Sequence, residues 1–365
     1  MSKPDYVLAA LIGVFVVFGL LMLSSASAPF AISKFDNGYH YVIKQILHGF
    51  LPGIFLFLLF MRLDYRILKR YSNWILGATI LLLLLVFVPG VGASFGRAKS
   101  WISVGALFSF QPSELAKLGL IIFLAAWLEY RTKIKHFPKR DTLIKFLIIL
   151  GIVAGLVLLQ PDIGTMFIII FIGMIIYFVS GAPIKYLLGI FVGLLAGFFV
   201  LIQLAPYRMA RFTAFLDPAA DPQGIGYHIS QALLAIGSGG FFGVGFGHSR
   251  QKFQYLPEVS ADSIFAVVGE ELGFLFCALL VVGFIVLLVR GLKIAQKAPD
   301  FFGKLLAIGI VSWIAGQAFV NIAAMLSLMP LTGVPLPFIS YGGTALMTTL
   351  AGCGILMNIS RWKNT

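Results

Sequence analysis

The stretch Tyr255-Leu-Pro-Glu-Val-Ser-Ala-Asp-Ser-Ile-Phe-Ala-Val-Val-Gly-Glu-Glu-Leu-Gly273 joins a polar segment to an apolar helix. Asp262 lies where that helix is expected to start, and Glu270 and Glu271 follow about two turns later. Ionised carboxylates are costly near a bilayer, so acids at such positions are candidates for function. The free amides and dipole of a helix N-terminus would offset part of that cost. The alternative is that Asp262 only caps the helix.

The composition indicates a membrane protein. Of the 365 residues, 60% are hydrophobic and only 11% are charged, whereas a soluble domain carries roughly 25% charged residues. The apolar runs are long enough to cross a bilayer as helices, and they lack the alternation of transmembrane β-strands. We therefore expect an all-α polytopic membrane protein with a single domain over residues 1–365. Cys277 and Cys353 lie inside apolar runs and are interpreted as packing residues.

About ten membrane-spanning helices are expected, and loop charge predicts their orientation. The expected spans are residues 6–27, 41–61, 73–88, 113–130, 143–160, 163–180, 184–204, 262–289, 303–327 and 339–360. Lys and Arg concentrate in alternate loops, such as residues 62–70, 131–140 and 290–304, and cytoplasmic loops carry this bias. Both termini are therefore expected in the cytoplasm. The net charge of +13 reflects this bias and attraction to anionic membrane lipid, and no nucleic acid needs to be invoked.

The outer side is expected to carry the site. The longest outer segment, residues 205–261, lies between the seventh and eighth spans, and its middle could form a helix in the membrane interface. Cations there would hold a phosphate or pyrophosphate, and a carboxylate could deprotonate a hydroxyl. We therefore hypothesise a lipid-linked phosphate substrate at the outer leaflet. The candidate substrate-binding residues are Arg97, Lys99, Trp101, Glu114, Lys117, Asp162, Arg208, Arg211, Lys252, Glu258 and Ser340.

Three of these features have simpler alternatives. Glu114 and Lys117 are three residues apart and share a helix face, so they form either a buried ion pair or part of an outward cavity. Asp162 is either a site residue or the cap of a hairpin turn. The glycine cluster from Gly237 to Gly247 is not a dinucleotide-binding fingerprint. It either packs tightly within the loop or lets backbone amides approach a phosphate.

Five motifs, taken together and in this order, resemble the SEDS family of shape, elongation, division and sporulation proteins, which includes FtsW, RodA and SpoVE. They are Gln111–Lys117, Gln160–Thr165, Tyr255–Glu258 with Asp262, Gly269–Gly273 and Pro335–Gly343. The resemblance covers nearly the whole chain. The segment from Gly245 to Glu258 is more similar to the division branch, that of FtsW, than to the elongation branch, that of RodA.

The resemblance implies a function and assigns roles. Family members are peptidoglycan glycosyltransferases of the bacterial cytoplasmic membrane that polymerise lipid II, and each works with a class B penicillin-binding protein. The division branch acts at the septum with other division proteins. The family's essential aspartate maps onto Asp262, and its Glu and Lys of the fourth span map onto Glu114 and Lys117. Asp262 would then be the general base, or alternatively a ligand for a divalent cation such as Mg²⁺ or Mn²⁺; no other cofactor is expected.

One departure and two alternatives remain. The family usually carries His-Thr-Asp-Phe around the essential aspartate, where this chain has Ser260-Ala-Asp-Ser263, so the neighbours of Asp262 differ. A lipid II flippase would need polar residues deep in many spans, and here they are sparse: Gln317, Asn321 and the pair Glu270–Glu271. A non-catalytic division scaffold would not require Asp262.

Overall fold

The computed structural model describes residues 4–95, 98–104, 108–133, 139–203, 206–218, 221 and 224–362. Its helices are α1 (Tyr6–Phe35), α2 (His40–Gln45), the π-helix η1 (Ile46–Phe50), α3 (Leu51–Arg62), α4 (Arg66–Arg70), α5 (Ser72–Leu85), α6 (Pro112–Lys133), α7 (Lys139–Leu159), α8 (Ile163–Val179), α9 (Ile184–Gln203), α10 (Pro206–Leu216), α11 (Ile225–Ser238), α12 (Ile264–Gln296), α13 (Phe301–Met325) and α14 (Gly343–Arg361). Its strands are β1 (Gly92–Phe95), β2 (Ala98–Val104) and β3 (Phe108–Phe110).

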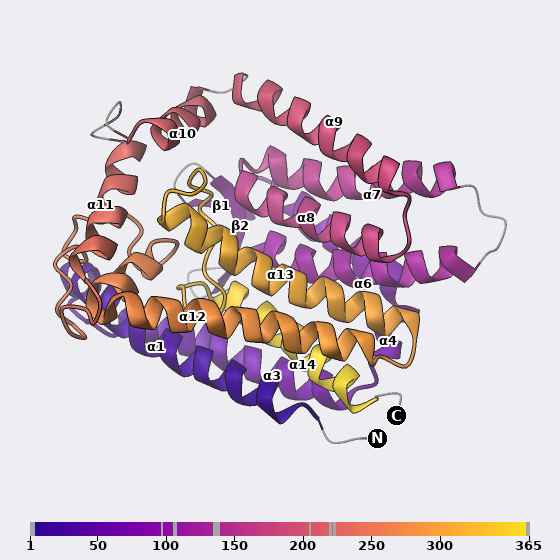
Figure 1. The fold of residues 1–365 in the computed structure, drawn as a ribbon, viewed down its shortest axis with the longest axis horizontal. Coiled ribbons are helices and arrows are strands. Elements are labelled where there is room, and N and C mark those ends of the chain that lie inside the picture. The colour runs from indigo at the N-terminus through magenta and orange to yellow at the C-terminus, as the bar shows by residue number, and fades with distance from the viewer. Residues whose placement is uncertain are drawn as a thin grey trace.

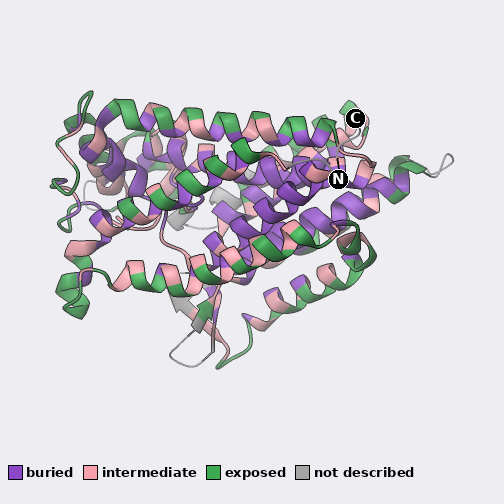
Figure 2. Cartoon of the chain, turned by 90° about the horizontal axis from the view of Figure 1, so that it is seen from below, coloured by how far each residue is buried: buried purple, intermediate pink, exposed green. Residues whose placement is uncertain are grey.

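The helices form one bundle around α13. This helix packs against α6, α8, α12 and α14 (Figure 1), and most of its side chains are buried. Buried residues gather in the central helices, while the peripheral helices alternate between buried and exposed faces (Figure 2). The exposed faces are themselves apolar, as on α9 with Leu188, Phe191 and Val192. An outward face of this kind suits contact with lipid rather than with water.

A helix lies at each of the ten predicted spans. Among the described residues, six helical segments are both long and apolar enough to cross a membrane: Tyr6–Phe35, His40–Arg62, Lys139–Leu159, Ile264–Gln296, Phe301–Met325 and Gly343–Arg361. Helices α5, α8 and α9 are apolar, but their apolar segments are shorter than those six. Helix α6 carries more charged residues. Both termini lie at the same end of the bundle (Figure 1), as an even number of crossings requires. The count of ten and the orientation stay predictions.

The segments predicted to lie on the outer side contain structure that the sequence did not predict. The region expected to be a plain loop before α6 forms an antiparallel sheet in the order β1-β2-β3, with Ile102 of β2 opposite both Gly92 and Phe110. Residues 205–261 contain two helices, α10 and α11, where one was expected. Helices α10 and α11 lie together at the end of the bundle opposite the termini (Figure 1).

Helix α12 departs from the continuous span predicted over residues 262–289. It begins at Ile264, and its backbone leaves helical geometry at Gly273, where φ is 78°. The backbone groups freed by this break bond to the glycine-rich loop: the amide of Val244 donates to Glu270 O (2.9 Å), and the amide of Phe274 donates to Gly240 O (2.9 Å). A Cβ on Gly243 would lie 2.2 Å from the carbonyl oxygen of Glu271. The glycine cluster therefore permits tight packing, which was one of its two predicted roles.

Glu270 and Glu271 also hold this loop. Glu270 accepts hydrogen bonds from the Ser249 hydroxyl (2.5 Å) and the Arg250 amide (2.8 Å). Glu271 forms a buried ion pair with Lys252 (2.8 Å) and accepts a hydrogen bond from the Ser25 hydroxyl (2.7 Å). Both acids are satisfied by neighbouring protein groups and serve to fasten the loop to α12 and α1.

Candidate active site

Asp262 lies in a turn, residues 257–263, directly before α12. Its side chain is 9% exposed, and its Oδ1 atom has no hydrogen-bond partner among the described residues. The N-cap position of α12 is taken by Ser263, whose side chain makes no capping bond within the described chain. Asp162 and Asp300, by contrast, cap α8 and α13 through their carboxylates. The structure therefore does not support the alternative in which Asp262 is only a helix cap.

Backbone and hydroxyl contacts from the last outer loop hold this turn in place. The amide of Ala261 donates to Glu258 O (2.9 Å), and the amide of Tyr341 donates to Ser260 O (2.8 Å). The Ser340 hydroxyl donates to Ala261 O and accepts from the Leu336 amide (2.8 Å). Ser340, which was predicted to bind substrate, thus bonds to the residue that precedes Asp262 and supports the turn.

Two amide side chains of α13 bond to the proline-rich loop 330–337, and one of them also bonds to the turn. The amide nitrogen of Asn321 donates to Asp262 O (2.8 Å) and to Val334 O (2.9 Å). One turn earlier, Gln317 donates to Pro335 O (2.9 Å). The sequence had marked these residues only as rare polar positions in a span. Their spacing of four residues, which puts both on one helix face, was the signal that they act together.

Glu114 and Lys117 form a buried ion pair next to this network. Their side chains are 2% and 0% exposed, and Lys117 Nζ lies 2.7 Å from Glu114 Oε1. Lys117 also donates to Gln317 Oε1 (2.7 Å), which accepts a second bond from Trp313 (2.9 Å). A continuous set of contacts thus runs from Glu114 through Lys117 and α13 to the turn of Asp262. The pair takes the buried arrangement, and its contact with substrate stays a prediction.

The electrostatics of the turn suit acid–base chemistry. Burial raises the pKa of Asp262 to about 6, although neighbouring backbone amides and the charge of Arg211 oppose the rise. Arg211 of α10 also donates to Leu331 O (3.1 Å), which fixes it beside the turn. Burial raises the pKa of Glu258, and the negative charge of Asp262 raises it further. Burial lowers the pKa of His228, on α11, to about 4. Sequence reasoning missed His228.

Other predicted site residues lie elsewhere. Asp162 caps α8 by accepting from the Thr165 amide (2.9 Å), and it also accepts from the Gln111 side chain (3.2 Å). These contacts fit the alternative in which Asp162 is a cap. Lys252 is engaged by Glu271, far along α12 from Asp262, and its geometry favours a structural role rather than the predicted substrate contact. Trp101 lies on β2, half-buried and opposite Ala93.

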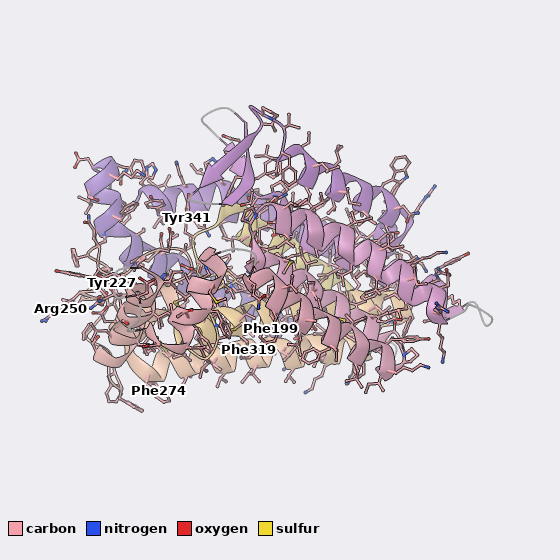
Figure 3. The ribbon with its side chains drawn as sticks, turned by 90° about the horizontal axis from the view of Figure 1, so that it is seen from above. Phe199, Tyr227, Arg250, Phe274, Phe319 and Tyr341 are labelled. Atoms are coloured by element: carbon pink, nitrogen blue, oxygen red, sulfur yellow. The ribbon has the colours of Figure 1, made fainter. Side chains whose placement is uncertain are left out.

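The remaining predicted cations have side chains outside the described part of the structure. Arg97 lies outside the described residues, as do the side chains of Lys99 and Arg208, whose backbones belong to β2 and α10. Arg250, by contrast, is exposed and points away from the protein at the end of the bundle that holds α11 (Figure 3).

A divalent cation at Asp262 would have few protein ligands. Within the described ranges, no three His, Cys, Asp or Glu residues gather as a metal site. Asp262 Oδ1 and Asn321 Oδ1 are both buried without a partner among the described residues, and the Asn321 amide nitrogen contacts the backbone of Asp262. Hard oxygen ligands of this kind suit Mg²⁺ or Mn²⁺, which often complete their coordination with water and substrate phosphates. The residues therefore fit a cation only if a pyrophosphate supplies further ligands.

The fold and the site define a polytopic α-helical membrane protein with a buried carboxylate at one end of its bundle. The chain belongs to the FtsW/RodA/SpoVE family, since the family model, described as cell cycle protein, matches residues 5–365. It is 42% identical to stage V sporulation protein E of Bacillus subtilis, over 99% of this chain and 98% of that protein. It is 39% identical to the probable peptidoglycan glycosyltransferase FtsW of Geobacter sp. strain M18, over 98% and 96%.

Solved structures agree with this assignment. One is a chain of a peptidoglycan synthase complex, in a study of the structural coordination of polymerization and crosslinking; it is 32% identical, each chain covers 99% of the other, and the TM-score is 0.80. Another is the rod shape determining protein RodA of Thermus thermophilus, at 30% identity, with 99% and 98% of the two chains covered and a TM-score of 0.72.

Proposed function

We propose that this protein is a peptidoglycan glycosyltransferase that polymerises lipid II at the outer face of the bacterial cytoplasmic membrane. The observation that carries the proposal is Asp262, a buried carboxylate whose Oδ1 has no partner in the described structure and whose pKa is raised to about 6. A general base is most effective when its pKa lies near the operating pH. The names of the relatives, probable peptidoglycan glycosyltransferases, support the same activity.

In the proposed reaction, Asp262 removes the proton from a hydroxyl of the acceptor sugar. The oxygen attacks the anomeric carbon of the donor lipid II, and the bond from that carbon to the undecaprenyl pyrophosphate breaks. The leaving group takes the bonding electron pair, and Asp262 retains the proton until it passes to solvent. Arg211, held beside the turn by Leu331 O, stabilises negative charge that develops on the pyrophosphate.

A divalent cation would supply further charge neutralisation for the pyrophosphate when bound. Asp262 and Asn321 are the residues that would hold it, through the oxygens without partners. In that case Asp262 acts as a ligand and another group accepts the acceptor's proton. Activity measured after chelation and after return of Mg²⁺ or Mn²⁺ separates the two roles.

The partner proposed for this activity is a class B penicillin-binding protein that cross-links the product, and the proposed place of action is the division septum. A synthase complex among the structural neighbours supports a partnered enzyme. The relatives named FtsW support the division branch.

Purified protein with labelled lipid II tests the proposal. Glycan strands should form in the presence of the partner, and Asp262→Asn should abolish them while the protein stays folded in detergent. Asn retains the size of Asp and can still act as a helix cap, so only the charge and basicity are lost. Near-normal glycan from the variant would overturn the catalytic assignment.

Liposomes distinguish a polymerase from a flippase. Lipid II supplied to the leaflet that faces the outer loops should be polymerised, and its crossing between leaflets should not accelerate. Deep acids that a transport path could use, Glu270 and Glu271, are already bonded to Ser249, Lys252 and Ser25. Movement of headgroups that persists in Asp262→Asn, with no glycan formed, would favour the flippase.

A further inference from the structure

His228 makes a hydrogen bond to the residue next to Asp262. Its Nε2 atom lies 2.6 Å from Ser263 Oγ, and Ser263 Oγ in turn donates to Pro257 O (2.8 Å). A serine hydroxyl has one proton. While Ser263 donates that proton to the Pro257 carbonyl, Ser263 Oγ accepts from His228, and the proton of the neutral imidazole is then on Nε2.

This contact closes the turn that carries Asp262. Pro257 and Ser263 are the first and last residues of the turn, and the hydrogen bond from the Ser263 hydroxyl to Pro257 O joins its two ends. His228 connects that hydroxyl to α11, an element with no other described side-chain bond to the turn. Ser263 directly follows Asp262, so the same hydroxyl places a partner on α11 beside the aspartate.

We propose that His228 is a positioning residue for Asp262, acting through Ser263 to hold the turn in the geometry that the reaction needs. The inference rests on the proposed glycosyl transfer and adds a residue to it. Small displacements of a catalytic group are costly, because about 1 Å of misplacement can reduce a rate about a hundredfold.

The charge state of His228 fits a positioning role. The charged groups facing it are Glu258 of the turn and Arg211 of α10; burial, and then the charge of Arg211, lower its pKa to about 4 against the opposing charge of Glu258. The imidazole is therefore neutral at the pH of the reaction and donates its hydrogen bond without adding a positive charge. A cation here would lower the pKa of Asp262, as Arg211 already does, and would weaken it as a base.

Steady-state kinetics on four variants and one control variant test the role. His228→Ala and Ser263→Ala should each lower kcat at least tenfold and leave KM for lipid II within twofold. His228→Gln, whose amide NH₂ can replace the Nε2 donor, should keep at least half of the wild-type kcat. The double Ala variant should be no slower than the slower single variant, since both changes break one contact. Tyr227→Phe, on the adjacent residue of α11 (Figure 3), should retain wild-type values.

Hydrogen exchange measured by mass spectrometry tests the contact without relying on activity. Amides of residues 258–263 should exchange faster in His228→Ala than in the wild type, and at wild-type rates in His228→Gln. Unchanged exchange in His228→Ala, a wild-type kcat in that variant, or equal impairment of His228→Gln would each overturn the inference. Absence of glycan from the wild-type protein would instead count against the proposed function, and the exchange result would still decide the role of His228.

Discussion

The side-chain amide of Asn321 lies 2.8 Å from the backbone carbonyl oxygen of Asp262. Asn321 is 1% exposed and belongs to the central helix of the bundle. The candidate catalytic residue is therefore held in place by a buried helix of the bundle as well as by the loops around it.

Replacing Asn321 tests that dependence. Asn321→Leu keeps an approximate size but leaves the carbonyls of Asp262 and Val334 without their donor, and each unsatisfied buried group costs about 1–3 kcal/mol. We expect a lower melting temperature in detergent. We also expect kcat for polymerisation to fall by a factor at least ten times larger than the factor by which KM changes. Gln203→Leu, on an exposed position of α9, is the control and should change neither property. Wild-type activity in Asn321→Leu would show that the contact is dispensable.

Asp262→Asn should be more stable than the wild type at neutral pH. Burial raises the pKa of Asp262 to about 6 from an ordinary value near 3.8, so the folded protein binds this proton more tightly than the unfolded chain does. The ionised carboxylate therefore destabilises the fold increasingly between pH 4 and 6, reaching about 3 kcal/mol above that range. Thermal unfolding should show the variant stabilised at pH 7.5 and equal to the wild type below pH 4. No gain at pH 7.5 would contradict the raised pKa.

The same ionisation predicts the acid side of the activity profile. Asp262 must be ionised to accept a proton, so the initial rate of lipid II consumption should fall as the pH drops through about 6. A rate that stays constant down to pH 4.5 would mean that another group is the base.

Glu114 and Lys117 should behave as a coupled pair. Removing one partner of a buried ion pair leaves an uncompensated charge and costs about 3–5 kcal/mol, so Lys117→Met should lower both stability and activity. Glu114→Gln combined with Lys117→Met should recover stability. Activity should not return if Lys117 also holds substrate; recovery of both properties in the double variant would mark the pair as structural. A melting curve and a polymerisation assay on the wild type and these two variants decide this.

A methyl group on Gly243 should separate the glycine-rich loop from α12. Its Cβ would meet the carbonyl oxygen of Glu271 at 2.2 Å, and its φ of +81° already disfavours other residues. Gly243→Ala should lower the melting temperature and expose the loop to protease. Gly237→Ala is the matched control, because a Cβ there meets no atom within 4 Å. Equal stability of the two variants would argue against the backbone contact.

The sequence was most informative where one physical effect dominates. Apolar runs located the helices because burial of backbone groups in lipid requires helix, and the expense of an acid near a bilayer singled out Asp262. Other features depend on partners distant in the chain. The break at Gly273 exists because loop 240–245 supplies its hydrogen bonds, and Gln317 gains its role only beside Lys117 and Pro335. The hydrophobic pattern and helix propensity of a single span cannot predict contacts with residues elsewhere in the chain.

The break in α12 also bears on how the protein is made. Peptide groups without partners are costly in hydrocarbon, and the carbonyls of Glu270 and Glu271 find their partners in Val244 and Gly245. These donors precede α12 in the chain, so they leave the ribosome first. In the predicted orientation, with this loop on the outer face, export of the loop is expected to come before the first part of α12 packs beside it, so biogenesis of the end that holds the candidate site would depend on the order of translocation.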